Sequence, residues 1–181
     1  AICLQTVNGV NAAQGILSYR QVLLMDVFIA KAMSYVVIQT IVITIVLVGL
    51  AMFGFDVVPP HPIEFAGVIL LTVALAFGLG LVLAALASVI PDARSVIAIL
   101  FMPLYLISGV LFPVTRFPEE MQRWMAINPV LHLVELSRVT AVKGYVPMKY
   151  LSVEYPIALA LVSIVFGLML YRLRYLTRVT M

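Results

Sequence analysis

Charged side chains are scarce in this sequence. Only 10% of its 181 residues are Asp, Glu, Lys or Arg, whereas 64% are hydrophobic. Soluble domains carry roughly 25% charged residues, so most of this chain's exterior is expected to face lipid. The high hydrophobicity also excludes a disordered chain, and a net charge of +3 without a dense basic patch disfavours a nucleic-acid partner.

Cysteine and the common catalytic motifs are also nearly missing. The single cysteine, Cys3, excludes an internal disulfide framework and a Cys-based zinc site. The sequence has no G-x-x-x-x-G-K-[ST] phosphate loop, no H-E-x-x-H and no G-x-S-x-G. We therefore expect no cofactor or metal on this chain, and uphill transport would need energy from another polypeptide.

Four apolar stretches are long enough to cross a bilayer, which takes about 20 residues of helix. Their continuous apolar pattern lacks the alternation of barrel strands, so it predicts an all-α polytopic membrane protein with one transmembrane domain. Residues 1–10 are interpreted as the end of a preceding span, which makes the chain an N-terminally incomplete piece. The predicted spans are residues 28–55, 65–90, 96–115 and 152–172.

The connections between these spans predict the orientation of the chain. One side, which includes the segment before the first span, the loop at 91–95 and the tail at 173–181, holds six of the eleven Lys and Arg residues when the span ends are counted. The other side holds six of the eight acidic residues. The positive-inside rule therefore places the first side in the cytoplasm.

The long connection after the third span is predicted not to cross the membrane. A span here would bring charged residues into lipid, at about 2.5–3.5 kcal/mol for each one near the bilayer centre. The Asn128-Pro129 pair would also interrupt it, because the residue before proline avoids the α-helical region. We expect two short helices within residues 117–143, either re-entrant or lying as an amphipathic hairpin on the outer surface.

Three spans carry side chains in helical register. Tyr35 and Gln39 follow Lys31 on one face of the first span, and small residues recur every four positions from Thr72 to Ser88 in the second. Helix packing explains such stripes. For Tyr35 and Gln39, the alternative is that they line a path for the substrate. In the third span, aromatic rings are predicted to share one face, either for packing and lipid contact or to stack on sugars along a path. That face comprises Phe101, Tyr105, Ser108 and Phe112.

Residues in the connection after the third span and in the segment before the first span suggest further contacts, within the protein or with a partner. His132, Glu135 and Arg138 step by three, which favours either a mutual ion network or contact with an anionic substrate or a partner. Trp124 is expected to anchor the outer segment at the membrane interface. The apolar, aromatic segment from Asn11 to Asp26 is predicted to be a helix lying on the membrane or docked on a cytoplasmic partner.

Three sequence blocks resemble a known family. They are N-x-x-Q-G-x-x-x-Y-R at residues 11–20, PLY-x-ISG-x-x-FP at 103–113 and NPVLHLVELSR at 128–138. All three are similar to the membrane permease of ATP-binding-cassette exporters for capsular polysaccharide, the KpsM type. The resemblance covers essentially the whole chain. Permeases for O-antigen and teichoic acid share the architecture but match the third block less closely.

The resemblance implies a fold of six spans, of which this chain has the last four, in the bacterial inner membrane. It implies that residues 11–27 form a coupling helix on the ATPase and that residues 117–143 form outward-facing re-entrant helices. It also implies two permeases, two ATPases that bind ATP and Mg²⁺, a periplasmic co-polymerase, an outer-membrane export protein and a lipid-linked anionic polysaccharide. The coupling residues at matching positions are Asn11, Gln14, Tyr19, Arg20 and Asp26; the outward gate contains Trp124, Asn128, His132, Glu135 and Arg138.

Two other classes of function remain compatible with the residues. A membrane-embedded enzyme of polymer or lipid metabolism would need an acid, a base or a metal near one membrane face, and the only crowded candidates are Glu119, Glu120, His132 and Glu135. An exporter of drugs or small lipids would differ only in its cargo.

Overall fold

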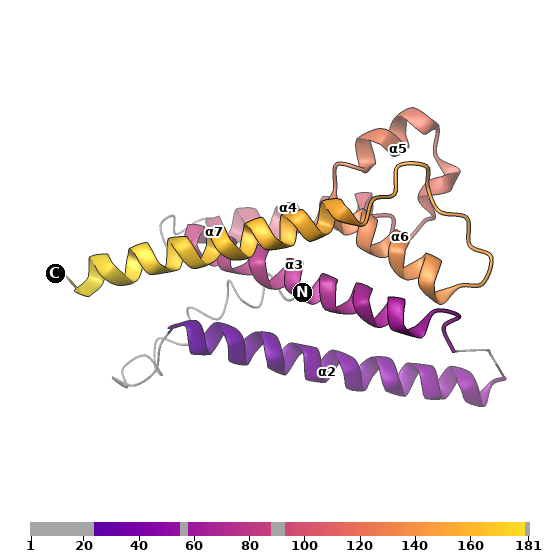
Figure 1. Cartoon of the computed structure of the whole chain (residues 1–181), viewed down its shortest axis with the longest axis horizontal. Coiled ribbons are helices and arrows are strands. Elements are labelled where there is room, and N and C mark those ends of the chain that lie inside the picture. The colour runs from indigo at the N-terminus through magenta and orange to yellow at the C-terminus, as the bar shows by residue number, and fades with distance from the viewer. Residues whose placement is uncertain (1–23, 55–57, 88–92, 180–181) are drawn as a thin grey trace.

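The computed structural model describes residues 24–54, 58–87 and 93–179, and every regular element within them is helical (Figure 1). The all-α prediction is therefore confirmed. The elements in chain order are α2 (Leu24–Met52), α3 (Pro62–Ala87), α4 (Ala93–Ile107), the 3-10 helix η1 (Val114–Arg116), α5 (Glu119–Met125), α6 (Pro129–Ala141) and α7 (Glu154–Val179).

Three of these helices are long and apolar enough to cross a membrane. The qualifying segments are Phe28–Met52, Pro62–Ala87 and Glu154–Arg172, of 25, 26 and 19 residues. At about 1.5 Å per residue, each approaches or exceeds the thickness of the hydrocarbon core. Helix α7 continues beyond the last of these segments to Val179, so the predicted tail at 173–181 begins as part of the same helix; no glycine or proline interrupts the helix there.

The third predicted span is shorter than expected. Its helix, α4, has 15 residues and ends at Ile107, so the prediction of a helix up to residue 115 is wrong. Gly109 has a φ of +69°, and a Cβ there would lie 2.6 Å from the Val114 side chain. Only glycine fits this tight turn, which redirects the chain into η1 and the two short helices beyond it.

Helices α3 and α7 form the central pair of the molecule, and their backbones approach closely. A Cβ at Gly78 would lie 2.5 Å from Ser163 Oγ, and a Cβ at Gly167 would lie 2.7 Å from Leu81 Cβ. Helix α6 packs across both helices through a cluster of buried side chains, which includes Leu75, Leu133 and Ala160. Small residues thus allow the tight contact that stabilises helix pairs in lipid.

The segment from η1 to the start of α7, residues 114–153, forms a compact cap at one end of the helices (Figure 1). Its own core is the cluster of Val114, Leu131 and Met148. The His61 N–H donates to the Thr140 carbonyl at 3.4 Å, which ties the connection between α2 and α3 to the end of α6. Both connections predicted on the acidic side therefore lie at the same end of the molecule.

Candidate functional site

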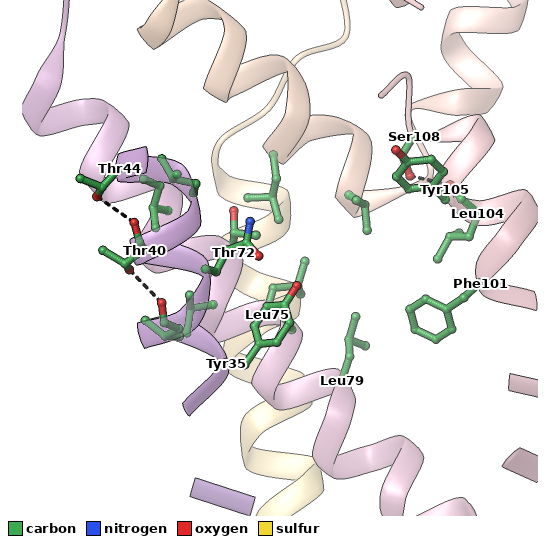
Figure 2. A pocket seen from close by; sticks show the side chains of 18 residues that line it. Tyr35, Thr40, Thr44, Thr72, Leu75, Leu79, Phe101, Leu104, Tyr105 and Ser108 are labelled. Carbon is green, nitrogen blue, oxygen red and sulfur yellow. Dashed lines mark hydrogen bonds between the residues drawn. The ribbon is translucent and has the colours of Figure 1, made fainter. Parts of the chain in front are cut away.

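A cavity of about 540 Å³ opens between α2, α3, α4 and the start of α6. Figure 2 shows Phe101 and Tyr105 on one side of it, across from Tyr35 and Thr72. Its lining is mostly aliphatic and aromatic, and it contains no charged side chain among the residues that the structure describes. A volume of this size is typical of a small-molecule site.

Five residues predicted from two separate helix faces line this one cavity: Tyr35, Gln39, Phe101, Tyr105 and Ser108. The sixth predicted residue, Phe112, is not among the lining residues and is 60% exposed. The prediction that Phe112 shares the helix face is therefore wrong, because α4 ends at Ile107 and the helical register stops at the turn of Gly109, directly after Ser108. A helical spacing rule holds only while the helix continues.

Most hydroxyl groups in the cavity wall already donate to their own helix. Each of four hydroxyls donates to the carbonyl four residues earlier, at 2.5–2.8 Å; the donors are Thr40, Thr44, Thr72 and Ser108. Such bonds are local and satisfy the hydroxyl within the helix. The polar atoms in the wall are consequently less available to a ligand than the residue names suggest.

The part of the small-residue stripe that lies in α3 faces α2 rather than α7, and Ser88 lies outside the described residues. Thr72 and Ala76 line the cavity, and Ala84 packs in a buried cluster with Phe28 of α2. The close backbone contact with α7 uses Gly78, which the stripe does not include. The spacing Ser163-x-x-x-Gly167 in α7 is a small-residue pair of the type that signals such a contact.

Asn128 connects the cap to the cavity wall. Its Oδ1 accepts from the Val130 N–H at 3.0 Å and so caps α6, while its Nδ2 donates to Ser108 Oγ at 2.9 Å. The helix break predicted at Asn128-Pro129 is confirmed, because α5 ends at Met125 and α6 begins at Pro129. The Asn128 side chain thus caps the N-terminus of α6 and also fixes the position of Ser108 in the cavity wall.

A buried ion pair ties α6 to the end of α4. Arg138 Nη1 donates to Glu135 Oε1 at 2.9 Å, and its Nη2 donates to the carbonyls of Gly109 and Val110. Glu135 is fully buried and also accepts from the Tyr145 hydroxyl at 3.0 Å. Burial and the bond to Glu135 raise the pKa of Tyr145 above its ordinary value. The spacing of three residues predicted the pair of Glu135 and Arg138, but no sequence pattern indicated that Tyr145 would contact it.

His132 is not part of that ion network, so this portion of the prediction is wrong. Its Nδ1 accepts from the Ser152 N–H at 3.1 Å, which leaves Nε2 to donate to the Ala126 carbonyl at 2.8 Å. The ring also meets Tyr155 edge to face, and the Tyr155 hydroxyl donates to the Ile127 carbonyl. These bonds satisfy the carbonyls at the end of α5, so His132 stabilises the turn between the two short helices.

The surface of the cap carries an exposed contact between α5 and the loop before α7. Glu119 accepts from Lys149 Nζ at 2.6 Å and from the Tyr150 hydroxyl at 2.8 Å. Both hydrogen bonds, with the Lys149 charge, hold the pKa of Glu119 below its ordinary value. Trp124 on α5 is 75% exposed, and its role as an interface anchor stays a prediction.

The residues considered for an enzyme do not form a catalytic cluster. Glu119 and Glu135 are engaged in separate pairs, and both ring nitrogens of His132 bond the backbone. Across the described parts of the chain, no group of three or more His, Cys, Asp or Glu residues is placed to hold a metal.

The predicted coupling residues lie largely outside the described part of the chain. Asn11, Gln14, Tyr19 and Arg20 all precede residue 24. Asp26 is described, and it lies in the first turn of α2. The coupling helix expected to end at residue 27 therefore overlaps α2, which begins at Leu24.

Comparison with known proteins adds an independent observation. Residues 16–142 match the family described as ABC-2 type transporter. The chain is 31% identical over 179 residues to the polysialic acid transport protein KpsM of Escherichia coli, covering 96% of this chain and 67% of that protein. It is 27% identical over 135 residues to the capsule polysaccharide export inner-membrane protein CtrC of Neisseria meningitidis, covering 73% of this chain and 50% of that protein.

Proposed function

This chain belongs to the ABC-2 type transporter family, and on that premise we propose that it is a permease subunit for the export of capsular polysaccharide across the bacterial inner membrane. The observation that carries the proposal is the alignment with KpsM, which covers 96% of this chain. The three span-length helices agree with a multi-pass membrane protein.

The energy for export comes, in this proposal, from a separate ATPase subunit that binds ATP and Mg²⁺. Two features of the chain support this part. The sequence has no phosphate loop, and the described cavity wall has no ionisable group that would carry a coupling ion, apart from tyrosine. Two ATPases and two permeases assemble, and the segment with Asn11, Gln14, Tyr19 and Arg20 docks on the ATPase.

The transport step is a rearrangement of helices. Closure of the ATPase dimer on ATP displaces the segment at 11–27, and the spans transmit that movement to the boundary between the two permeases. A lipid-linked anionic polysaccharide then moves outward past the cap. A periplasmic co-polymerase and an outer-membrane export protein continue the route. The bonds that Asn128 and Arg138 make to the end of α4 support a mechanical connection between the cap and the cavity wall.

The test uses the full-length permease together with the ATPase subunit of the same organism's capsule exporter. We expect the two proteins to co-purify, the complex to hydrolyse ATP faster in the presence of the lipid-linked polymer, and the pair to restore capsule in cells that lack their own permease. Tyr19→Ala with Arg20→Ala is expected to lose the ATPase during purification. ATP hydrolysis that responds to drugs or free lipids, but not to the polymer, would instead assign another cargo. Product formation by this chain without an ATPase would contradict the proposal.

A further inference from the structure

We propose that the cavity between α2, α3 and α4 holds the hydrocarbon chain of the exported glycolipid, with the anionic linkage of that lipid beside Lys31. This inference rests on the proposed function, because it assigns one part of the substrate to one part of the path. It differs from the expectation that Phe101 and Tyr105 stack on sugars. The glycan itself would then travel elsewhere in the assembly.

The hydrogen-bonding state of the wall favours hydrocarbon over sugar. A sugar ring has several hydroxyl groups, and each one that loses water without a new partner lowers affinity. The hydroxyls of Thr40, Thr72 and Ser108 already donate to their own helices. The wall has few other polar side chains, namely those of Tyr35, Gln39 and Tyr105 and the similarly bonded Thr44. A hydrocarbon chain needs no such partners, and it gains by covering the apolar and aromatic surface of the wall.

The charge distribution points to the same occupant. An anionic glycan inside the cavity would need cations, and the lining described here has none. Lys31 lies one turn before Tyr35 on the same face of α2, at the end of the helix where the span begins. It makes no salt bridge with any carboxylate in the described residues. A cation at the entrance and a neutral apolar interior complement a lipid with a charged linkage.

The helices also leave a way in from the bilayer. Both α2 and α4 line the cavity, yet within the described residues these two helices make few or no direct contacts with each other. In the proposed arrangement, a hydrocarbon chain enters from the bilayer between these two helices. Figure 2 shows the aromatic side chains of α4 separated from α2 across this space.

The experiment places a photo-crosslinking residue, p-benzoylphenylalanine, at Thr40 in the full-length permease bound to its ATPase, in cells that make capsule. Ile38 is the matched control, because it lies at nearly the same depth of α2, is 59% exposed and does not line the cavity. Irradiated protein is purified and its adducts are identified by mass spectrometry. The same measurement is made with Lys31→Gln and with Lys31→Arg added to Thr40→p-benzoylphenylalanine.

We expect the hydrocarbon part of the glycolipid to be attached at position 40 and only bulk phospholipid at position 38. Lys31→Gln should lower the glycolipid yield by about fivefold and Lys31→Arg should restore it. Three outcomes would each overturn the inference: a crosslink from position 40 to the sugar, crosslinks to the same phospholipids from both positions, or a crosslink from position 40 to a peptide of another helix. In those cases continued capsule export would leave the proposed function standing. Failure of the unmodified permease to restore capsule would overturn both.

Discussion

Two acidic residues of the cap, Glu119 and Glu135, form ion pairs. They differ in burial, and burial determines how much each pair matters for the stability of the protein. Glu135 has no exposed surface, whereas the side chain of Glu119 is 58% exposed. A pair at the surface contributes little to stability because water and salt screen it. A buried pair costs desolvation when it forms, but removal of one partner leaves an uncompensated charge in the interior.

Arg138→Met is therefore expected to destabilise the protein by about 3–5 kcal/mol, because it leaves the buried Glu135 without its guanidinium partner. Thermal unfolding of the purified permease in detergent measures the effect. Arg123→Met, at an exposed position of α5, is the control. The double change Glu135→Gln with Arg138→Met should regain part of the loss; equal melting temperatures for Arg138→Met and Arg123→Met would show that the pair does not stabilise the cap.

The contacts of Glu119 predict that the stability of the protein depends slightly on pH. Its pKa is lower in the folded protein than its ordinary value of 4.5, so the contact with Lys149 stabilises the fold above that value. The contribution disappears as the pH falls through the lowered pKa. Glu119→Gln should therefore melt slightly below the unmodified protein at pH 7, and the difference should vanish in strong acid. A difference that grew on acidification would contradict the assigned contact.

At the scale of helices, the packing of α3 against α7 depends on glycine. Gly78→Ala would place a Cβ 2.9 Å from the backbone nitrogen of Ile164, so one helix must shift. We expect a loss of about 1–3 kcal/mol in the free energy of unfolding. Gly67→Ala in the same helix meets nothing within 4 Å, and it should be neutral or slightly stabilising, since alanine favours helix. Chemical unfolding of both variants makes the comparison.

The sequence predicted the existence of the helices better than their ends. Long apolar runs require a helix in lipid, because every backbone polar group must find a partner within it. The end of α4 depends instead on the turn at Gly109, where the Val114 side chain leaves no room for a Cβ. That contact is absent from any local pattern. The break before Pro129 was predictable because proline acts on its direct neighbour.

At the scale of the whole molecule, the cavity predicts which aromatic residues affect export. Phe101→Ala with Tyr105→Ala removes two rings from the wall and should lower capsule export by about tenfold. Phe112→Ala should leave export close to normal, because Phe112 lies outside the cavity. Surface capsule is measured at equal amounts of permease in the membrane. A larger loss with Phe112→Ala than with the double change would remove the cavity from the path.

Five of the six predicted path residues meet in this cavity because helical register places residues correctly while a helix is intact. The partners of the polar residues were harder to predict. Tyr145 reaches Glu135 from a loop, and His132 bonds two backbone groups instead of the neighbouring ion pair. Such contacts depend on how loops return to a helix, which spacing along one helix does not encode.

The glycine contacts between α3 and α7 also determine where the molecule can bend. At Gly78 and Gly167 the two helices approach so closely that there is no room for an added Cβ, so neither helix can slide or roll past the other at low cost. Helix α2 packs on the rest of the protein much more lightly. We therefore expect the α3–α7 pair to move as one unit, and any change in the tilt of α2 relative to this pair would change the width of the cavity.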